Sequence, residues 1–191
     1  FKSARDFCGP VRVLARADVD FTLYSIGFSR EEYVFYAEHF HEPVFIEERI
    51  AVMAARWPVE DPESLGEHVR ELLEEAAVEK SFTDPAAPSA VELAAVRDAV
   101  NDALARADMP GALKERFRKA LPGLLGDFFE RFCASEPAFA FIRVQDWHWL
   151  AATHCEAADV RVVHHEQVGG RYVLLLANED ATRLLEGHGI L

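Results

Sequence analysis

The chain has 191 residues, half of them apolar and 28% charged, which is the balance of an ordinary globular domain. Its 33 acidic residues against 20 lysines and arginines give a formal net charge of −13. So acidic a chain is poorly suited to nucleic acid, whose phosphates need clustered basic groups, and no apolar run approaches the ~20 residues of a membrane-spanning helix.

The first part of the chain predicts an extended segment followed by two helices. Residues 11–26 contain alternating apolar positions and many strand-forming residues, so we expect one or two short strands or an extended arm there. The sequence Ser29-Arg30-Glu31-Glu32 matches a capping box and predicts a helix over residues 30–41. Proline then interrupts the pattern, and residues 43–57 carry apolar side chains at the helical period, which predicts a second helix.

The third predicted helix has an apolar face and an acidic face. Asp61-Pro62 combines an N-cap acid with proline at the first helical position, so the helix begins there and runs to about residue 79. Its apolar stripe consists of Leu65, Val69, Leu72, Leu73, Ala76 and Ala77. The opposite side is expected to expose Glu67, Glu71, Glu74 and Glu75.

Prolines and small polar residues make residues 81–90 the clearest expected linker. Ser89 and Glu92 have the spacing of a capping box and predict a helix that ends near residue 107. Two further prolines restart the helical pattern, which gives expected helices over residues 111–120 and 123–133.

The hydrophobic period changes after this helical region. Residues 138–144 read as a buried strand, and residues 160–167 and 171–177 read as a hairpin joined through Gly169-Gly170. Asn178 then stands at the N-cap of a short closing helix.

These elements predict an α+β protein. About five to six helices in the N-terminal and central region are expected to pack with a small C-terminal antiparallel sheet and a short closing helix. The expected organisation is an N-terminal arm with an acidic helical segment (1–80), a linker (81–90) and a helical core with the C-terminal hairpin (91–191), all in one compact unit.

The charge is unevenly distributed along the chain. Residues 29–95 hold 16 of the 33 acids and 5 of the 20 bases, a net charge of −11, whereas the rest of the chain is nearly neutral. This asymmetry predicts an acidic face that binds a partner with a basic or peptide-like surface. Trp147 and Trp149, expected in a connection between two strands, are candidate anchors for that partner.

Histidine and cysteine side chains offer a weaker alternative, a metal site. His148, His154, Cys155 and His164 combine nitrogen and sulfur ligands of the kind that zinc, iron or copper bind. Their spacing matches no metal signature, so a structural role is favoured and no cofactor is expected. Three cysteines without a CxxC pair favour a reducing compartment, hence the cytoplasm.

No motif for nucleophilic catalysis or phosphate binding occurs in the sequence. The favoured interpretation is therefore a non-catalytic accessory subunit in a hetero-oligomer rather than a homo-oligomer, without nucleic acid or membrane. It docks on an enzyme through the acidic face or presents a peptide added as a strand to its C-terminal sheet. The alternatives are a metal-binding protein or metal-dependent enzyme, an acidic immunity or inhibitor protein against a basic toxin, and a homodimeric helical scaffold.

Overall fold

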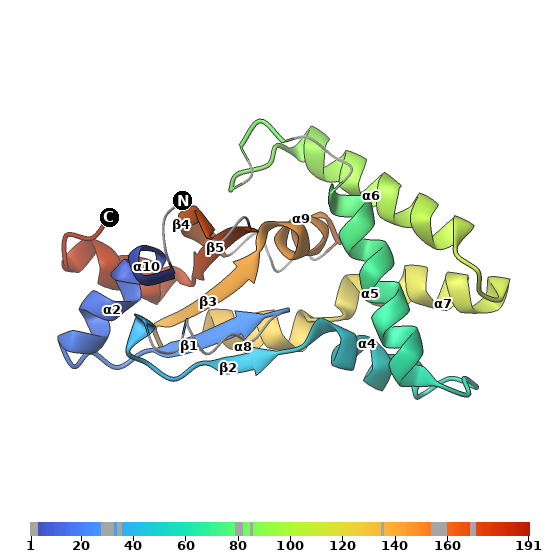
Figure 1. The fold of residues 1–191 in the computed structure, drawn as a ribbon, viewed down its shortest axis with the longest axis horizontal. Coiled ribbons are helices and arrows are strands. Elements are labelled where there is room, and N and C mark those ends of the chain that lie inside the picture. The colour runs from blue at the N-terminus through green and yellow to red at the C-terminus, as the bar shows by residue number, and fades with distance from the viewer. Residues whose placement is uncertain are drawn as a thin grey trace. The chain divides into compact units, whose positions relative to one another are not determined.

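The computed structural model describes residues 4–27, 33, 36–78, 82–84, 86–134, 136–153, 160–168 and 171–191, with the backbone alone at residues 78, 168 and 171. The chain has the expected α+β architecture (Figure 1) and divides into two compact units. Unit 1 comprises Phe1–Val44, Glu130–Val144 and Asp159–Leu191, and unit 2 comprises Phe45–Phe129 and Gln145–Ala158. The expected linker over residues 81–90 falls inside unit 2, so it does not separate the units.

Unit 1 contains the sheet and the helices of both chain ends. Its elements are α1 (Ala4–Phe7), α2 (Gly9–Arg16), β1 (Thr22–Ile26), β2 (Glu42–Val44), β3 (Ala138–Arg143), β4 (Arg161–Val168), β5 (Arg171–Ala177) and α10 (Glu179–Gly187). Unit 2 is helical and holds α4 (Ile46–Ala54), α5 (Pro62–Val78), α6 (Ala90–Arg106), α7 (Gly111–Ala120), the 3-10 turn η1 (Leu121–Gly123), the first part of α8 (Gly126–Ala134) and nearly all of α9 (Val144–Thr153).

The sheet is larger than the hairpin expected from the sequence. Strands β4 and β5 form that hairpin, but the sheet has five strands in the order β2-β1-β3-β5-β4. Strand β1 pairs in parallel with β2 and β3, whereas β5 is antiparallel to β3 and β4. The N-terminal strands therefore join the C-terminal hairpin through β3, which lies in the middle of the sheet.

Two local expectations need correction. Residues 11–26 contain one short strand, Thr22–Ile26, as expected, but residues 11–16 belong to helix α2. Val11 and Leu14 are buried on one face of this helix, and their i, i+3 spacing outweighs the apparent alternation. The expected helix over residues 43–57 begins later, at Ile46, since Pro43 lies in β2 at the edge of the sheet. An edge strand tolerates proline because one side of its backbone needs no ladder partner. Of the helix expected over residues 30–41, residues 33, 36 and 37 are helical and residues 38–41 are not, while the other five lie outside the described residues.

One face of the sheet carries the apolar core of unit 1. Side chains at alternate positions of β1, β3 and β5 point to this face and pack against α1, α2 and α10. Phe7, Phe141 and Tyr33 meet there with ring centroids 5.4 to 6.0 Å apart. The alternate side chains of β3 and β5 that point to the opposite face are buried as well, so both strands are covered on both faces.

Asn178 joins three parts of unit 1 through its buried side chain. Its Oδ1 accepts hydrogen bonds from the backbone N–H of Ala181, as an N-cap of α10, and from the N–H of Ala138 at the start of β3. Its Nδ2 donates to the carbonyl oxygens of Phe132 and Glu136, 2.9 and 3.3 Å away. The N-cap predicted from the sequence therefore also binds the end of α8 and the start of β3, which lie about 40 residues before it in the chain.

Unit 2 follows the predicted helices closely. The apolar stripe of α5 is buried at Val69, Leu73, Ala76 and Ala77, as its period indicates. The capping box before α6 is confirmed, because the Ser89 hydroxyl accepts from the Glu92 N–H and the Glu92 carboxylate accepts from the Ser89 N–H. Within the residues described, no helix has both the length and the apolar composition required to cross a membrane.

Helices α4 and α5 approach each other closely at Gly66. A Cβ atom at this position would lie 2.6 Å from the Glu47 carbonyl oxygen and 3.2 Å from the Ala51 Cβ. Glycine is therefore required there by space, and it fixes how near the two helices come.

We predict that Asn178→Ala destabilises the protein by roughly 2–4 kcal/mol, because it leaves buried backbone groups of three segments without partners. Ser89→Ala, which removes an N-cap that is exposed to water, should cost about 1 kcal/mol. Urea unfolding measures both values. Equal losses in the two variants would show that Asn178 acts only as a helix cap.

We predict that Gly66→Ala costs roughly 1–3 kcal/mol, because the added methyl group meets backbone that cannot move without separating α4 from α5. Gly111→Ala is the matched control, since nothing lies within 4 Å of a Cβ built at that helical position. Thermal unfolding should show the control unchanged or slightly more stable. A neutral Gly66→Ala variant would contradict the close approach.

Candidate protein-docking surface

The acidic side of α5 is exposed over most of the helix. Glu63, Glu67, Glu71 and Glu75 are all exposed, and each lies four residues after the one before it. Side chains at this spacing lie along one side of a helix, so they form a continuous row of carboxylates. Glu74 differs from them because it is half-buried beside Arg70.

A hollow of about 550 Å³ lies between α4 and α5. Four carboxylates line it, those of Glu47, Glu48, Glu63 and Glu67, together with Ala51 and Val52. The Val52 side chain is 61% exposed, which is unusual for a large apolar residue in this protein. The hollow therefore combines an apolar wall with acidic groups, and we call it the acidic hollow.

Arg70 is turned away from the acidic row and into the helical unit. Its Nη2 lies 3.3 Å from Asp146 Oδ2, and its Nε lies 3.3 Å from Glu47 Oε2. Glu74 is a third and more distant partner at 3.9 Å. One guanidinium is thus shared among three carboxylates. Its positive charge therefore does not neutralise the exposed row of glutamates on α5.

Asp146 is the most buried member of this cluster. Burial raises the pKa of its carboxyl to about 7, Arg70 opposes that rise, and the neighbouring Glu74 and Glu47 add to it. The indole N–H of Trp149 donates to the carboxylate and also favours its charged form. The pKa of Asp146 is raised overall because its complete burial outweighs the one nearby cation, which two further acids also share.

Trp147 and Trp149 are not surface anchors. Their exposed fractions are 5% and 1%, so a partner cannot reach either ring without unfolding α9. The segment that carries them is a helix rather than an irregular connection between strands, and its side chains complete the core of unit 2. For these two residues the expected anchoring role is wrong, because burying an indole stabilises the fold more than exposing it.

The proposed metal ligands are distributed over both units. His148 is buried in unit 2, where its ring packs against Phe82 with centroids 3.6 Å apart and the ring planes tilted by 31°. His164 lies on β4 in unit 1 and stacks on Phe7 at 5.5 Å. His154 and Cys155 lie outside the described residues. Among the residues that are described, no three histidine, cysteine or acidic side chains form a group able to hold a metal ion.

Part of the acidic hollow was not expected from the sequence. Glu47, Glu48 and Glu63 belong to it, and Ala51 and Val52 supply its apolar wall. Two signals could have indicated them: adjacent acids in the first turn of α4, and an apolar residue outside the stripe that Ile46, Ile50 and Ala54 bury. Neither signal shows that α4 lies against α5.

The chain matches no protein-family model, no curated protein and no solved structure. Its function therefore has to be inferred from the chemistry of its own side chains.

The buried Asp146 predicts a pH-dependent stability. Because its folded pKa of about 7 lies above the ordinary aspartate pKa of 3.8, the folded protein holds a proton that the unfolded chain releases. The free energy of unfolding should therefore fall as pH rises from about 4 to 7, with the loss complete above pH 7. Asp146→Asn keeps the shape without titrating, so this part of the slope should disappear.

Urea unfolding between pH 4 and 8 measures this slope. Asp102→Asn, at an exposed position on α6, is the control and should keep the slope of the original protein. If the curves of the Asp146→Asn and original proteins run parallel, the carboxyl does not take up a proton on folding.

Proposed function

We propose that this protein is a non-catalytic accessory or inhibitor-like subunit that docks on a basic segment of another protein through the acidic hollow and the adjoining row of glutamates. The observation that carries the proposal is the hollow between α4 and α5, in which the exposed Glu48, Glu63 and Glu67 lie around the exposed Val52 and the half-buried Ala51.

The acidic hollow suits a lysine or arginine side chain better than a bare cation. These side chains have an apolar stem and a charged head, so the stem can lie on Ala51 and Val52 while the head meets the carboxylates. Glu48, Glu63 and Glu67 are exposed and have water-facing oxygens with which to receive it. The row continues past the hollow to Glu71 and Glu75, which would contact further basic residues of an extended segment.

The row of like charges is unfavourable for α5 itself. Glutamates four residues apart repel each other by a few tenths of a kcal/mol per pair. Arg70 lies on the same helix but pairs with Asp146 and Glu47, so it does not offset this repulsion. A basic partner would relieve this repulsion and would be steered to the surface at a rate that falls with salt. This supports a hetero-oligomer, and both an enzyme and a basic toxin fit as the partner.

A second candidate is peptide binding by strand addition, which the position of β4 favours. Among the described strands, β4 pairs with β5 alone and stands at the edge of the sheet, with eight residues available. The other edge strand, β2, has three residues, one of which is Pro43. An added peptide would perturb the backbone amide resonances of β4, whereas docking at the acidic hollow would perturb those of α4 and α5.

We place the protein in the cytoplasm as part of the same proposal. The chain has three cysteines and no CxxC pair. Cys8 is fully buried in the core of unit 1, where its Sγ contacts the Tyr33 carbonyl oxygen. An odd number of cysteines without a paired spacing favours a reducing compartment.

The triple variant Glu63→Lys, Glu67→Lys and Glu71→Lys should weaken binding of a lysine- and arginine-rich peptide at least about tenfold at low salt. Binding is measured by fluorescence anisotropy of the labelled peptide, and thermal unfolding should remain unchanged because all three positions are exposed. Salt should weaken binding to the original protein as it screens the carboxylates.

The matched control reverses three other exposed acids of unit 2, Asp98, Asp102 and Asp108, and changes the net charge equally. It should leave peptide affinity within about twofold if the surface is local. Equal losses in both triple variants would mean that the peptide responds to net charge alone, and the proposed surface would be abandoned.

A further inference from the structure

The carboxylate of Glu47 lies between the acidic hollow and the buried ion pairs of Arg70. Glu47 lines the hollow, while its Oε2 lies 3.3 Å from the Arg70 Nε and is shielded from water. The side chain as a whole is 30% exposed, so it meets water through atoms other than Oε2. Glu47 therefore connects the surface on which a basic partner would dock with a group of charges inside the helical unit.

Those charges form what we call the Arg70 cluster, which consists of Glu47, Arg70, Glu74 and Asp146. Its net charge is −2 when all three carboxyl groups are ionised and −1 when Asp146 holds a proton. Both carboxylate oxygens of Asp146 lie close to the Arg70 Nη2, at 3.4 and 3.3 Å. Because Asp146 and Glu47 contact the same guanidinium, the charge of one is felt at the other through a space of low dielectric constant.

Asp146 is the member of the cluster whose charge changes near neutral pH. Burial raises the pKa of its carboxyl to about 7. The charged groups that face it come from α5 and α4, and they are Arg70, Glu74 and Glu47. The other titratable residue of α9 is His148, whose ring packs against Phe82. Since the charge of Glu47 helps to keep the proton on Asp146, a cation beside Glu47 would lower the pKa of Asp146.

We propose that the Arg70 cluster makes docking at the acidic hollow depend on pH: loss of the Asp146 proton adds a negative charge behind Glu47 and strengthens the binding of a basic segment. By linkage, the binding of that segment releases the proton from Asp146. This regulation rests on the proposed docking function, and it means that the complex is tighter above about pH 7 and weaker in a more acidic medium.

Coulomb's law gives the size of the effect. At an effective dielectric constant of about 20, one unit charge about 10 Å from another changes an affinity by on the order of tenfold. Salt and penetrating water reduce this value, so we expect a change of about three- to tenfold between pH 5.5 and 8.0.

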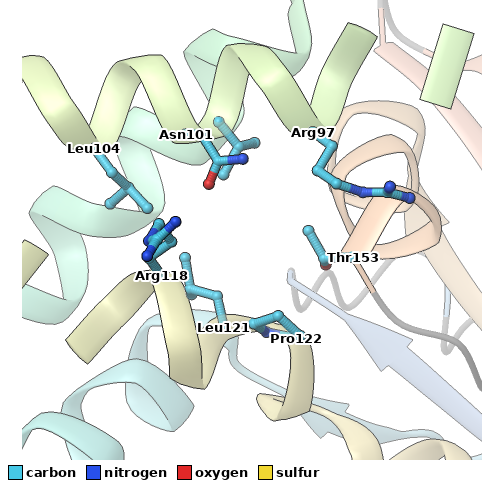
Figure 2. A pocket seen from close by; sticks show the side chains of 8 residues that line it. Arg97, Asn101, Leu104, Arg118, Leu121, Pro122 and Thr153 are labelled. Atoms are coloured by element: carbon cyan, nitrogen blue, oxygen red, sulfur yellow. The ribbon is translucent and has the colours of Figure 1, made fainter. Parts of the chain in front are cut away.

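A second hollow of unit 2 provides a comparison within the same protein. It has a volume of about 220 Å³ and lies between α6, the end of α7 with η1, and the last turn of α9 (Figure 2). None of the residues that line it is acidic. Figure 2 shows the Arg97 guanidinium turned toward α9, where its Nε donates to a backbone carbonyl oxygen, and Arg118 pairs with Glu115. This lining offers a basic segment no carboxylate, so the amide resonance of Asn101 should not respond to the segment.

The test is a titration of the whole chain with a labelled peptide of arginine, lysine and leucine, at constant ionic strength and at pH values from 5.5 to 8.0. The original protein should bind the peptide about three- to tenfold more tightly at pH 8.0 than at pH 5.5. Asp146→Asn has no charge at any pH and should keep the weaker affinity throughout. The other titratable groups, including the exposed His68 of α5, are present in both proteins, so the difference between their curves reports Asp146.

Glu47→Gln and Glu48→Gln are a matched pair of variants. Both acids line the acidic hollow, and of the two it is Glu47 that contacts Arg70 in the described part of the chain. Each variant should weaken peptide binding. Glu47→Gln should also move the midpoint of the remaining pH dependence to lower pH, because it removes an acid that helps to hold the Asp146 proton. Glu48→Gln should keep the midpoint of the original protein.

Proton release measures the same coupling without a substitution. Calorimetric titrations at pH 7 in two buffers of different ionisation enthalpy should show that peptide binding releases a fraction of a proton from the original protein. This release should be lost in Asp146→Asn. Thermal unfolding of each variant shows that the fold is kept.

The possible failures are distinguishable. An affinity that rises with pH equally in the original and Asp146→Asn proteins, binding without proton release, or equal midpoints in Glu47→Gln and Glu48→Gln would overturn the pH dependence and leave the docking function in place. No saturable binding at any pH would overturn the docking function itself. A larger response of the Asn101 amide than of the Val52 amide would place the peptide elsewhere and overturn both.

Discussion

The ion pairs of Arg70 with Asp146 and Glu47 determine the charge distribution of the helical unit. A guanidinium on α5 could have neutralised the glutamates beside it, but it reaches Asp146 of α9 and Glu47 of α4 instead. Three elements are thereby joined through one cation, and the exposed side of α5 keeps its full negative charge. A buried pair of this kind adds little net stability when it replaces apolar packing, but removing one partner is costly. The cluster therefore defines the relative positions of α4, α5 and α9 more than it adds to the free energy of unfolding.

Helix packing in unit 2 produces two hollows with different linings. The first exists because Gly66 lets α4 and α5 approach closely, so that acids from both helices line one space. The second exists where the side of α6 that carries Arg97 and Asn101 meets the turn between α7 and α8. The first hollow places Ala51 and Val52 beside four glutamates, and the second places Leu104 and Leu121 beside Arg118.

Several elements could be predicted because their signals are local. Ser89 and Glu92 satisfy each other's backbone groups within four residues, and Asn178 caps α10 in the same way. The hairpin of β4 and β5 likewise follows from alternation along neighbouring segments. Pro43 shows the limit of such signals. Proline excludes a helix interior and a central strand alike, and only the place of β2 at the sheet edge decides that it belongs to a strand.

The sequence by itself determined the α+β class, the helices of unit 2 other than α9, and the acidic side of α5, because periodicity and capping depend on residues that are near one another in the chain. The tertiary structure alone decided that Trp147 and Trp149 are buried, that β1 and β2 join the C-terminal hairpin, and that Glu47 and Glu48 face Glu63 and Glu67. Burial and the meeting of distant side chains depend on how elements pack. That packing is a sum of many weak contacts that no local pattern records.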